Sequence, residues 1–399
     1  MYVSVIKLLC VMLNLQDNRK GYIFMKKLYT IFLSVITAFS MVSCSPSSTY
    51  LEETTHQAVM SPTNVTDDTE SNEDLKIESI VTVIPNKNED LTPIKDIKTI
   101  TVTAAGDCTL GTDESFAYTG SFMDEFEKQN KDYGYFFKNV KDIFSNDDLT
   151  IVNLETTLTT ATKKADKQFR FKGLPEFTEI IKAGDIEAVN IANNHTMDYL
   201  EKGYNDTVEN LKAAGIGFFG NNHMYTTTIK GIKIGLLGYK GFSNGNDIKN
   251  QIKTDIENLK KDNCQLVIVS FHWGIERDNY PNSVQKDLGR FAIDIGADLV
   301  LGHHPHVIQG IEQYNGKYIV YSLGNFCFGG NRNPSDKDTF IFQQTFEFKN
   351  GKRTDNDDIN IIPCSVSSIK NRNNYQPTPV YDEEAERILK RIEEYSKEF

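Results

Sequence analysis

The stretch "DLVLGHHPHV", Asp298–Val307, places an apolar run directly before a group of histidines. Three of the chain's seven histidines fall within its residues 303–306. A short continuous apolar run is typical of a strand buried on both faces, as in parallel sheets. The stretch therefore predicts a core strand whose carboxyl end carries imidazole side chains.

Strand-like runs of this kind alternate with helical patterns through most of the chain. Such alternation predicts an α/β fold with a largely parallel, buried sheet. Two later runs, 339–348 and 359–366, alternate polar and apolar residues more strictly and are expected in a second sheet. The other expected strands are 99–107, 149–155, 188–195, 216–220, 232–239, 266–274, 299–304 and 318–326, and the expected helices are 175–184, 204–215, 255–262 and 283–296.

Polar side chains stand at the carboxyl ends of six of these expected strands. Taken singly, each has an ordinary explanation as a turn residue, a strand terminus or a packed side chain. Ligands of open α/β sheets bind outside the carboxyl ends of the strands, so six such ends together predict one shared site. The residues are Asp107, Glu155, Asn193, Asn194, His195, His272, His303, His304, His306 and Asn325.

The spacing of the histidines indicates how they are used. Alternate side chains of an extended segment face the same way, and Pro305 pushes His304 toward extended geometry. His304 and His306 are therefore expected to project together, with His303 on the other side as a packing residue or a support for the site. Imidazoles combined with carboxylate and amide oxygens suit Mn, Fe or Zn as the bound metal.

The first part of the chain reads as a leader and a spacer. Residues 25–44 have a basic start, an apolar run and a small-residue site, which predicts a lipoprotein signal with lipidation at Cys44. An ordinary signal peptide or a membrane anchor is the alternative. The lipoprotein prediction implies an extracytoplasmic protein, lipid-anchored to the cell membrane. The expected organisation is a doubtful upstream extension at 1–24 before a start at Met25, the signal at 25–44, a disordered polar stalk at 45–97, a globular domain at 98–370 and a C-terminal amphipathic helix at 371–399.

Composition limits the partners of this chain. The formal net charge of −12 argues against nucleic acid, because binding phosphate needs clustered Lys and Arg. An anionic substrate would have to meet local positive charge from basic side chains or metal ions. The cysteines beyond Cys44 form no CxxC pair, so the sequence predicts neither a disulfide framework nor a thiolate metal site.

Seven motifs occur in order between Thr99 and Phe328: "GDCTLG", "NLETTL", "FRFKG", "NIANNHTMDY", "FHWGIE", "GADLVLGHHPHVIQG" and "YSLGNF". Together they resemble the bacterial capsule-synthesis proteins of the CapA/PgsA type, which are associated with poly-γ-glutamate. That family in turn resembles the calcineurin-like metallophosphoesterases. The resemblance implies an α/β fold of two packed mixed β-sheets flanked by helices in four layers. It also implies one or two divalent metal ions as cofactor.

The resemblance further implies a role for each polar residue. Asp107 would bind one metal ion, Glu155 would bridge two, Asn194 and His272 would bind the second, and His304 and His306 would divide between them. His195 would act as a general acid or stabilise the transition state. Asp198 would orient His195, or it is simply a charge at a helix N-terminus. Predicted substrate-binding residues are Arg170, Lys172, Asn193, Glu276 and Asn325, several of which could equally be surface charges or turn residues.

Two departures from the metallophosphoesterase pattern leave the number of ions open. Those enzymes have Asp-x-His where this chain has Asp107, Cys108 and Thr109, and an Asp where it has Glu155. The first ion thus loses an imidazole, and the site could hold one ion or two.

Two functional hypotheses follow from the resemblance. The first is a surface-anchored, metal-dependent hydrolase or transferase that acts on a capsule or wall polymer by phosphoester or amide chemistry, with an anionic polymer or a phosphoester as substrate. The second is a non-catalytic, polyanion-binding component of a polymer synthesis machine, working with membrane-bound synthase subunits. A third hypothesis, an unrelated α/β binding protein, predicts no tightly held metal.

Overall fold

The computed structural model describes residues 96–399. The predicted upstream extension, the lipoprotein signal with Cys44, and the predicted stalk up to residue 95 therefore lie outside the described residues. Within the described part, no helix is both long and apolar enough to cross a membrane.

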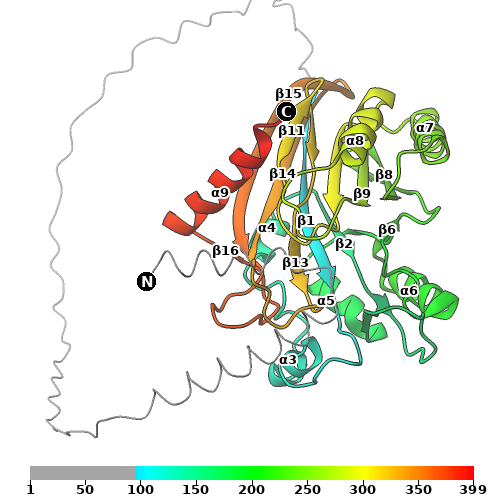
Figure 1. Ribbon diagram of the computed structural model, residues 1–399. Coiled ribbons are helices and arrows are strands. Elements are labelled where there is room, and N and C mark those ends of the chain that lie inside the picture. Colours follow the sequence, from blue (N-terminus) through cyan, green and yellow to red (C-terminus); the bar gives the residue numbers. More distant parts are fainter. Residues whose placement is uncertain (1–95) are drawn as a thin grey trace, which may run out of the picture. The chain divides into compact units, whose positions relative to one another are not determined.

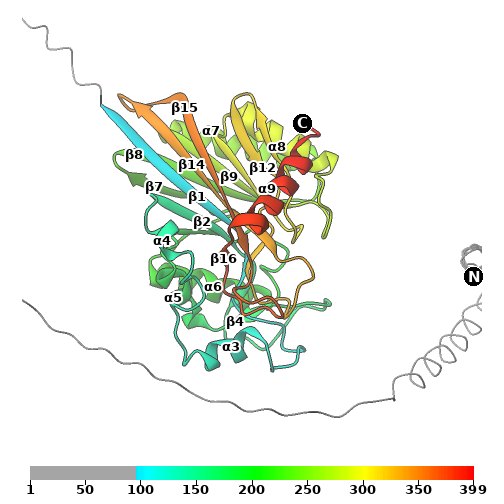
Figure 2. The same ribbon diagram turned by 90° about the vertical axis from the view of Figure 1, so that its left-hand side faces the viewer.

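The larger of two main sheets has eight strands and is mixed. Its parallel part is built from β1, β2, β5 and β6, with β13 pairing in parallel beside β1. The antiparallel part consists of β14, β15 and β16, and Figure 2 shows β1, β14 and β15 running side by side. The strands are β1 (Ile97–Thr109), β2 (Leu149–Leu154), β5 (Ala188–Asn190), β6 (Gly217–Phe219), β13 (Asn325–Phe328), β14 (Asp338–Lys349), β15 (Lys352–Ser365) and β16 (Thr378–Pro379).

The second sheet has six strands in the order β11-β12-β10-β9-β8-β7. Its four central strands are parallel, and the two edge strands are antiparallel to their neighbours. The strands are β7 (Tyr225–Ile229), β8 (Ile232–Gly241), β9 (Leu266–Trp273), β10 (Leu299–His303), β11 (Ile311–Tyr314) and β12 (Lys317–Val320); a separate pair is formed by β3 (Thr157–Leu158) and β4 (Lys172–Gly173).

Helices cover the outer faces of the two sheets. Residues of α7 and α8 pack on the outer face of the second sheet, and residues of α3 to α6 pack on the larger one (Figure 1). A third apolar cluster fills the space between the sheets. The predicted four-layer α/β architecture with two packed mixed sheets is confirmed. The helices are α3 (Phe122–Lys128), α4 (Lys141–Phe144), α5 (Thr178–Ala183), α6 (Leu200–Ala214), α7 (Asn246–Lys261) and α8 (Ser283–Ile295), with a 3₁₀ turn at Pro175–Phe177.

The C-terminal helix α9 (Asp382–Ser396) contacts a strand of each sheet, β11 and β15. Ile388 and Ile392 on this helix join the apolar cluster between the sheets. The sequence of α9 is amphipathic because only the face that carries Ile388 and Ile392 is buried.

The structure differs from the expectation for the runs 339–348 and 359–366. They form β14 and β15, which extend the sheet that contains β1 rather than a sheet of their own. Their alternating pattern arises because the second half of β14 alternates between buried and half-buried residues, and β15 is at least half-exposed along most of its length, as antiparallel strands with one solvated face commonly are.

Candidate metal centre

The carboxyl ends of strands from both sheets meet at one site. Three sets of side chains there could each hold a metal ion. Within each set, every side chain offers one ligand atom, and these atoms lie within 4.8 Å of one another. The sets are Glu155 with His272 and His304, Asp107 with Glu155 and His306, and Glu276 with His304 and His306. Asn194, also predicted as a ligand, has its Oδ1 2.9 Å from Nε2 of His272. The structure thus brings together all six predicted metal-binding residues.

Glu155 is the central residue of this cluster. Its side chain is fully buried, and neither carboxylate oxygen has a hydrogen-bond partner among the described residues. Its Oε1 lies 3.4 Å from Nε2 of His272 and 3.9 Å from Nε2 of His306. Burial, followed by the charges of Asp107, Glu276 and Asp198, raises the pKa of Glu155 well above its usual range. A buried carboxylate without a partner is costly, and a divalent cation would supply the missing interaction.

Burial favours the neutral form of the imidazoles of His272, His303 and His304. Burial, with the neighbouring histidines, lowers the pKa of His272 well below its usual value. Burial lowers the pKa of His304 and of His303 to about 4. Neutral imidazole is the form that binds metal, so the donor set of the site fits a divalent cation.

Asp107 is held in place by two hydrogen bonds. Its Oδ1 accepts from Nδ2 of Asn153 (2.8 Å), and its Oδ2 accepts from the backbone N–H of His304 (3.2 Å). Asn153 also places its Nδ2 3.2 Å from Nδ1 of His272, and its Oδ1 accepts from Nδ2 of Asn190. Asn153 therefore orients a predicted ligand from each sheet. Sequence reasoning missed it because it lies inside the apolar run of β2.

The backbone at the histidines contradicts the expected extended geometry. His304 and His306 have φ angles of +96° and +59°, in the left-handed region, and β10 already ends at His303. The two rings still face the same site, with centroids 5.7 Å apart. Alternation along a strand is therefore not the reason for their proximity: a tight turn around Pro305 brings them together. His303 is fully buried, with Nδ1 3.6 Å from Oδ1 of Asp107.

His195 and Asp198 form a buried pair beside Glu155. Nδ1 of His195 lies 2.6 Å from Oδ2 of Asp198, and its Nε2 lies 3.8 Å from Oε1 of Glu155. Lys167 binds the other Asp198 oxygen at 2.6 Å, and the His195 ring stacks on Phe171. Burial lowers the pKa of His195, although Asp198 opposes the shift. Lys167 was not predicted, because nothing in its local sequence links it to the strand ends.

The predicted substrate-binding residues lie in different surroundings. Asn193 accepts from the His195 backbone N–H and donates to the Leu154 carbonyl, so it shapes the backbone of the site. Oδ1 of Asn325 lies 2.9 Å from Nδ1 of His306, and its Nδ2 donates to the His306 carbonyl. Glu276 is exposed beside His304 and His306.

Arg170 and Lys172 are not brought to the site. The backbone N–H of Arg170 donates to Asp113, and its side chain lies near the same carboxylate. Lys172 forms an ion pair with Glu114. Neither residue lines the cleft that opens over the centre.

This cleft has a volume of about 880 Å³. His195, Glu276, His306 and Asn325 line it, together with four aromatic rings and three arginines that sequence reasoning missed. The rings are Phe116, Phe169, Phe171 and Phe328, and the arginines are Arg277, Arg332 and Arg372. Arg277 directly follows the "HWGIE" motif, and that adjacency was the available signal.

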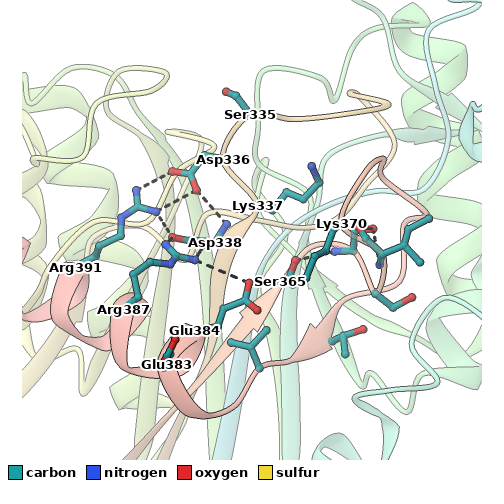
Figure 3. A pocket seen from close by; sticks show the side chains of 15 residues that line it. Ser335, Asp336, Lys337, Asp338, Ser365, Lys370, Glu383, Glu384, Arg387 and Arg391 are labelled. Atoms are coloured by element: carbon teal, nitrogen blue, oxygen red, sulfur yellow. Dashed lines mark hydrogen bonds and ion pairs between the residues drawn. The ribbon is translucent and has the colours of Figure 1, made fainter. Parts of the chain in front are cut away.

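A second cavity, of about 920 Å³, lies between α9 and the loop before β14 (Figure 3). Its two arginines are already paired: Arg391 binds Asp336 at 2.7 Å, and Arg387 binds Asp338 at 2.6 Å. None of the three sets of metal-ligating side chains found in residues 96–399 lies there. The cleft over Glu155 is therefore the candidate functional site.

Fold and site together define a four-layer α/β protein with a candidate metal centre at the carboxyl ends of strands from both sheets. The sequence identifies the family within this class. Residues 101–330 match the family of bacterial capsule synthesis proteins, PGA_cap, and the chain belongs to that family. The predicted resemblance to the CapA/PgsA type is confirmed.

Curated relatives point the same way. The chain is 34% identical over 230 residues to the PGA biosynthesis protein CapA of Bacillus subtilis, covering 52% of this chain and 60% of the relative. It is 32% identical over 221 residues to the capsule biosynthesis protein CapA of Bacillus anthracis, covering 49% and 54%. It is also 27% identical over 211 residues to a "Probable polyglutamine synthesis accessory protein" of Mycobacterium tuberculosis, covering 45% and 55%. The chain thus spans between half and two thirds of the length of these relatives.

Proposed function

We propose that this chain is a surface-anchored, metal-dependent hydrolase that cleaves a phosphoester or amide bond in an anionic polymer of the poly-γ-glutamate kind. Membership of the capsule-synthesis family and the names of its relatives support the polymer role. Lipidation at Cys44, an extracytoplasmic location and cooperation with membrane-bound synthase subunits belong to the same proposal. One observation supports the hydrolase function. The buried carboxylate of Glu155 has no hydrogen-bond partner among the described residues, and it lies beside the His195–Asp198 pair and close to His272, whose neutral form burial favours.

Two overlapping sets of residues would hold the cation. Glu155, His272 and His304 form one set, and Asp107, Glu155 and His306 form the other. A bound divalent ion such as Mn, Fe or Zn acts as a Lewis acid that polarises a substrate oxygen and lowers the pKa of water. Asn153 keeps Asp107 and His272 oriented for this role.

His195 is the group placed to move a proton. Asp198 fixes Nδ1 of the ring, so Nε2 is the atom turned toward Glu155 and the cleft. Because burial lowers the pKa of His195, its protonated form is a stronger acid than an ordinary imidazolium and can give its proton to a leaving group. Lys167 holds Asp198 from the other side and keeps the pair aligned.

One observation favours the alternative, a non-catalytic polyanion-binding component. The Thr109 hydroxyl donates to the Glu155 carbonyl at 3.2 Å, so it supports the backbone rather than a cation. The set around Asp107 therefore has one donor fewer than the metallophosphoesterase pattern, which favours a single ion. A single ion could bind polymer without cleaving it.

Purified full-length protein distinguishes the two functions. Metal content is measured by elemental analysis, and turnover is measured on a chromogenic phosphodiester and on a γ-linked glutamate oligomer. We expect stoichiometric metal and turnover that falls 100-fold or more, about the contribution of a positioned acid, in His195→Ala with metal content unchanged. His223→Ala is the matched control, because His223 bonds to Tyr204 away from the centre.

Metal binding and polymer affinity without turnover would establish the non-catalytic alternative. Absence of tightly held metal in freshly purified protein would refute both.

A further inference from the structure

Charged residues of the cleft differ in whether the protein already neutralises them. Arg372 is paired with Glu125 at 2.7 Å, and Asp336 is paired with Arg391 at 2.7 Å. These four charges are therefore satisfied inside the protein. The charged lining residues that remain are Glu276, Arg277 and Arg332.

Arg277 has no hydrogen-bond or ion-pair partner for its guanidinium anywhere in residues 96–399. Its backbone is held at φ +65°, where its N–H donates to the Pro305 carbonyl at 2.7 Å. A non-glycine residue in the left-handed region is sterically disfavoured and persists only when its surroundings hold it there. Pro305 lies between His304 and His306, so this bond ties Arg277 to the turn that carries two predicted metal ligands.

Arg332 lines the cleft on a different loop. One of its guanidinium nitrogens donates to the Thr119 carbonyl at 2.8 Å. That bond fixes the position of the side chain and leaves its charge without an acidic partner in the described part of the chain. Two guanidinium groups thus retain their charge in the cleft, although the whole chain carries a net charge of −12.

We propose that Arg277 and Arg332 bind carboxylates of the substrate beside the metal centre, which makes the substrate an acidic chain rather than a neutral one. This inference rests on the proposed polymer function. Guanidinium groups present paired donors that match a carboxylate, and such charge-assisted bonds are the stronger kind. The aromatic rings of Phe116, Phe169 and Phe328 in the same cleft suit the hydrocarbon part of such a chain. Glu276 is the one remaining acid, and its single negative charge offsets only one of the two guanidinium charges.

Isothermal titration calorimetry of the full-length, metal-loaded protein tests this assignment. The probes are a γ-linked glutamate oligomer, the matching γ-linked glutamine oligomer, and inorganic phosphate. We expect Arg277→Gln to weaken binding of the glutamate oligomer about 10-fold or more, with partial rescue in Arg277→Lys. Arg332→Gln should behave similarly, and metal content should not change. Lys253→Gln removes one charge from the exposed surface of α7 and should have no effect.

The outcomes separate this inference from the proposed function. Equal binding of the glutamate oligomer by wild type and Arg277→Gln overturns the inference, as does tighter binding of the glutamine oligomer by wild type. Binding of phosphate that Arg277→Gln weakens, without binding of the glutamate oligomer, shows that the arginines serve a phosphate and also overturns the inference. If wild type binds neither metal nor any oligomer, the proposed function itself fails.

Discussion

Replacing Glu155 with Gln should change the stability of the protein in opposite directions with and without metal. In metal-free protein, Glu155 must either stay charged without a partner or take up a proton. At pH 7, protonating a carboxyl with an ordinary pKa of 4.5 costs about 3 kcal/mol, at about 1.36 kcal/mol per pH unit. That cost is the upper limit of the penalty, because the group adopts whichever state is cheaper. The neutral amide of Gln avoids it.

Bound metal should make the wild type more stable than the Glu155→Gln variant. A cation at 1,000 times its dissociation constant stabilises the wild type by about 4.1 kcal/mol, which exceeds the penalty, and the Gln variant should gain little because an amide is a weak ligand. For a domain of this size, this gain raises the midpoint of thermal unfolding by about 7 °C. We therefore expect Glu155→Gln to be more stable than wild type in EDTA and less stable in excess Mn²⁺ or Zn²⁺.

The assay is thermal unfolding of both proteins at pH 7, with EDTA or with metal. Because the folded-state pKa of Glu155 is raised, the advantage of Gln in EDTA should shrink as the pH falls and vanish below about 4.5. Glu125→Gln is the control: Glu125 is equally buried but paired with Arg372, so its loss should destabilise the protein whatever the metal. A Glu155→Gln variant that is less stable than wild type in EDTA, or is stabilised by metal as much as wild type, refutes the reasoning.

Three further predictions concern other residues. Asn153→Ala should weaken metal binding about 10- to 100-fold in a metal titration, because Asp107 and His272 lose their common partner; unchanged affinity contradicts this. Burial raises the pKa of Glu187 to about 7, so its contribution to stability is present below pH 4.5 and is lost as the pH rises through 7. Glu187→Gln should therefore gain about 1 kcal/mol over wild type in urea unfolding at pH 8 and nothing at pH 4.5, after allowing for solvent screening. Gly302→Ala should destabilise the protein by about 3 kcal/mol in the same assay, because its Cβ would lie 2.0 Å from the Tyr321 carbonyl oxygen, whereas Gly245→Ala meets open space and should be nearly neutral.

The α/β character and the positions of the central strands could be predicted from sequence because buried strands leave long apolar runs. The polar residues that end those runs, such as Asp107, Glu155 and His272, could be recognised for the same reason. The division of the strands between two sheets could not, because β2 and β9 are equally apolar and only tertiary pairing separates them.

The backbone conformation at two histidines and the ion pairs of two basic residues could not be predicted from the neighbouring sequence. The left-handed backbone at His304 and His306 opposes the local preference of those residues and is imposed by the surrounding fold. Arg170 and Lys172 looked like anion-binding residues from their motif, but acidic neighbours distant in the chain, Asp113 and Glu114, attract them.

The candidate ligands come from both layers of the sandwich: Asp107 from β1 and Glu155 after β2 on one side, His272 from β9 and His304 after β10 on the other. A cation bound by all of them would act as a cross-link between the layers at one end only. Elsewhere the layers adhere through side-chain packing, which opens more readily. Loading and removing metal should therefore change how often the two layers open locally at the centre. Amide protons near the centre should exchange far more slowly in the loaded protein, while those near β7 keep the same exchange rate.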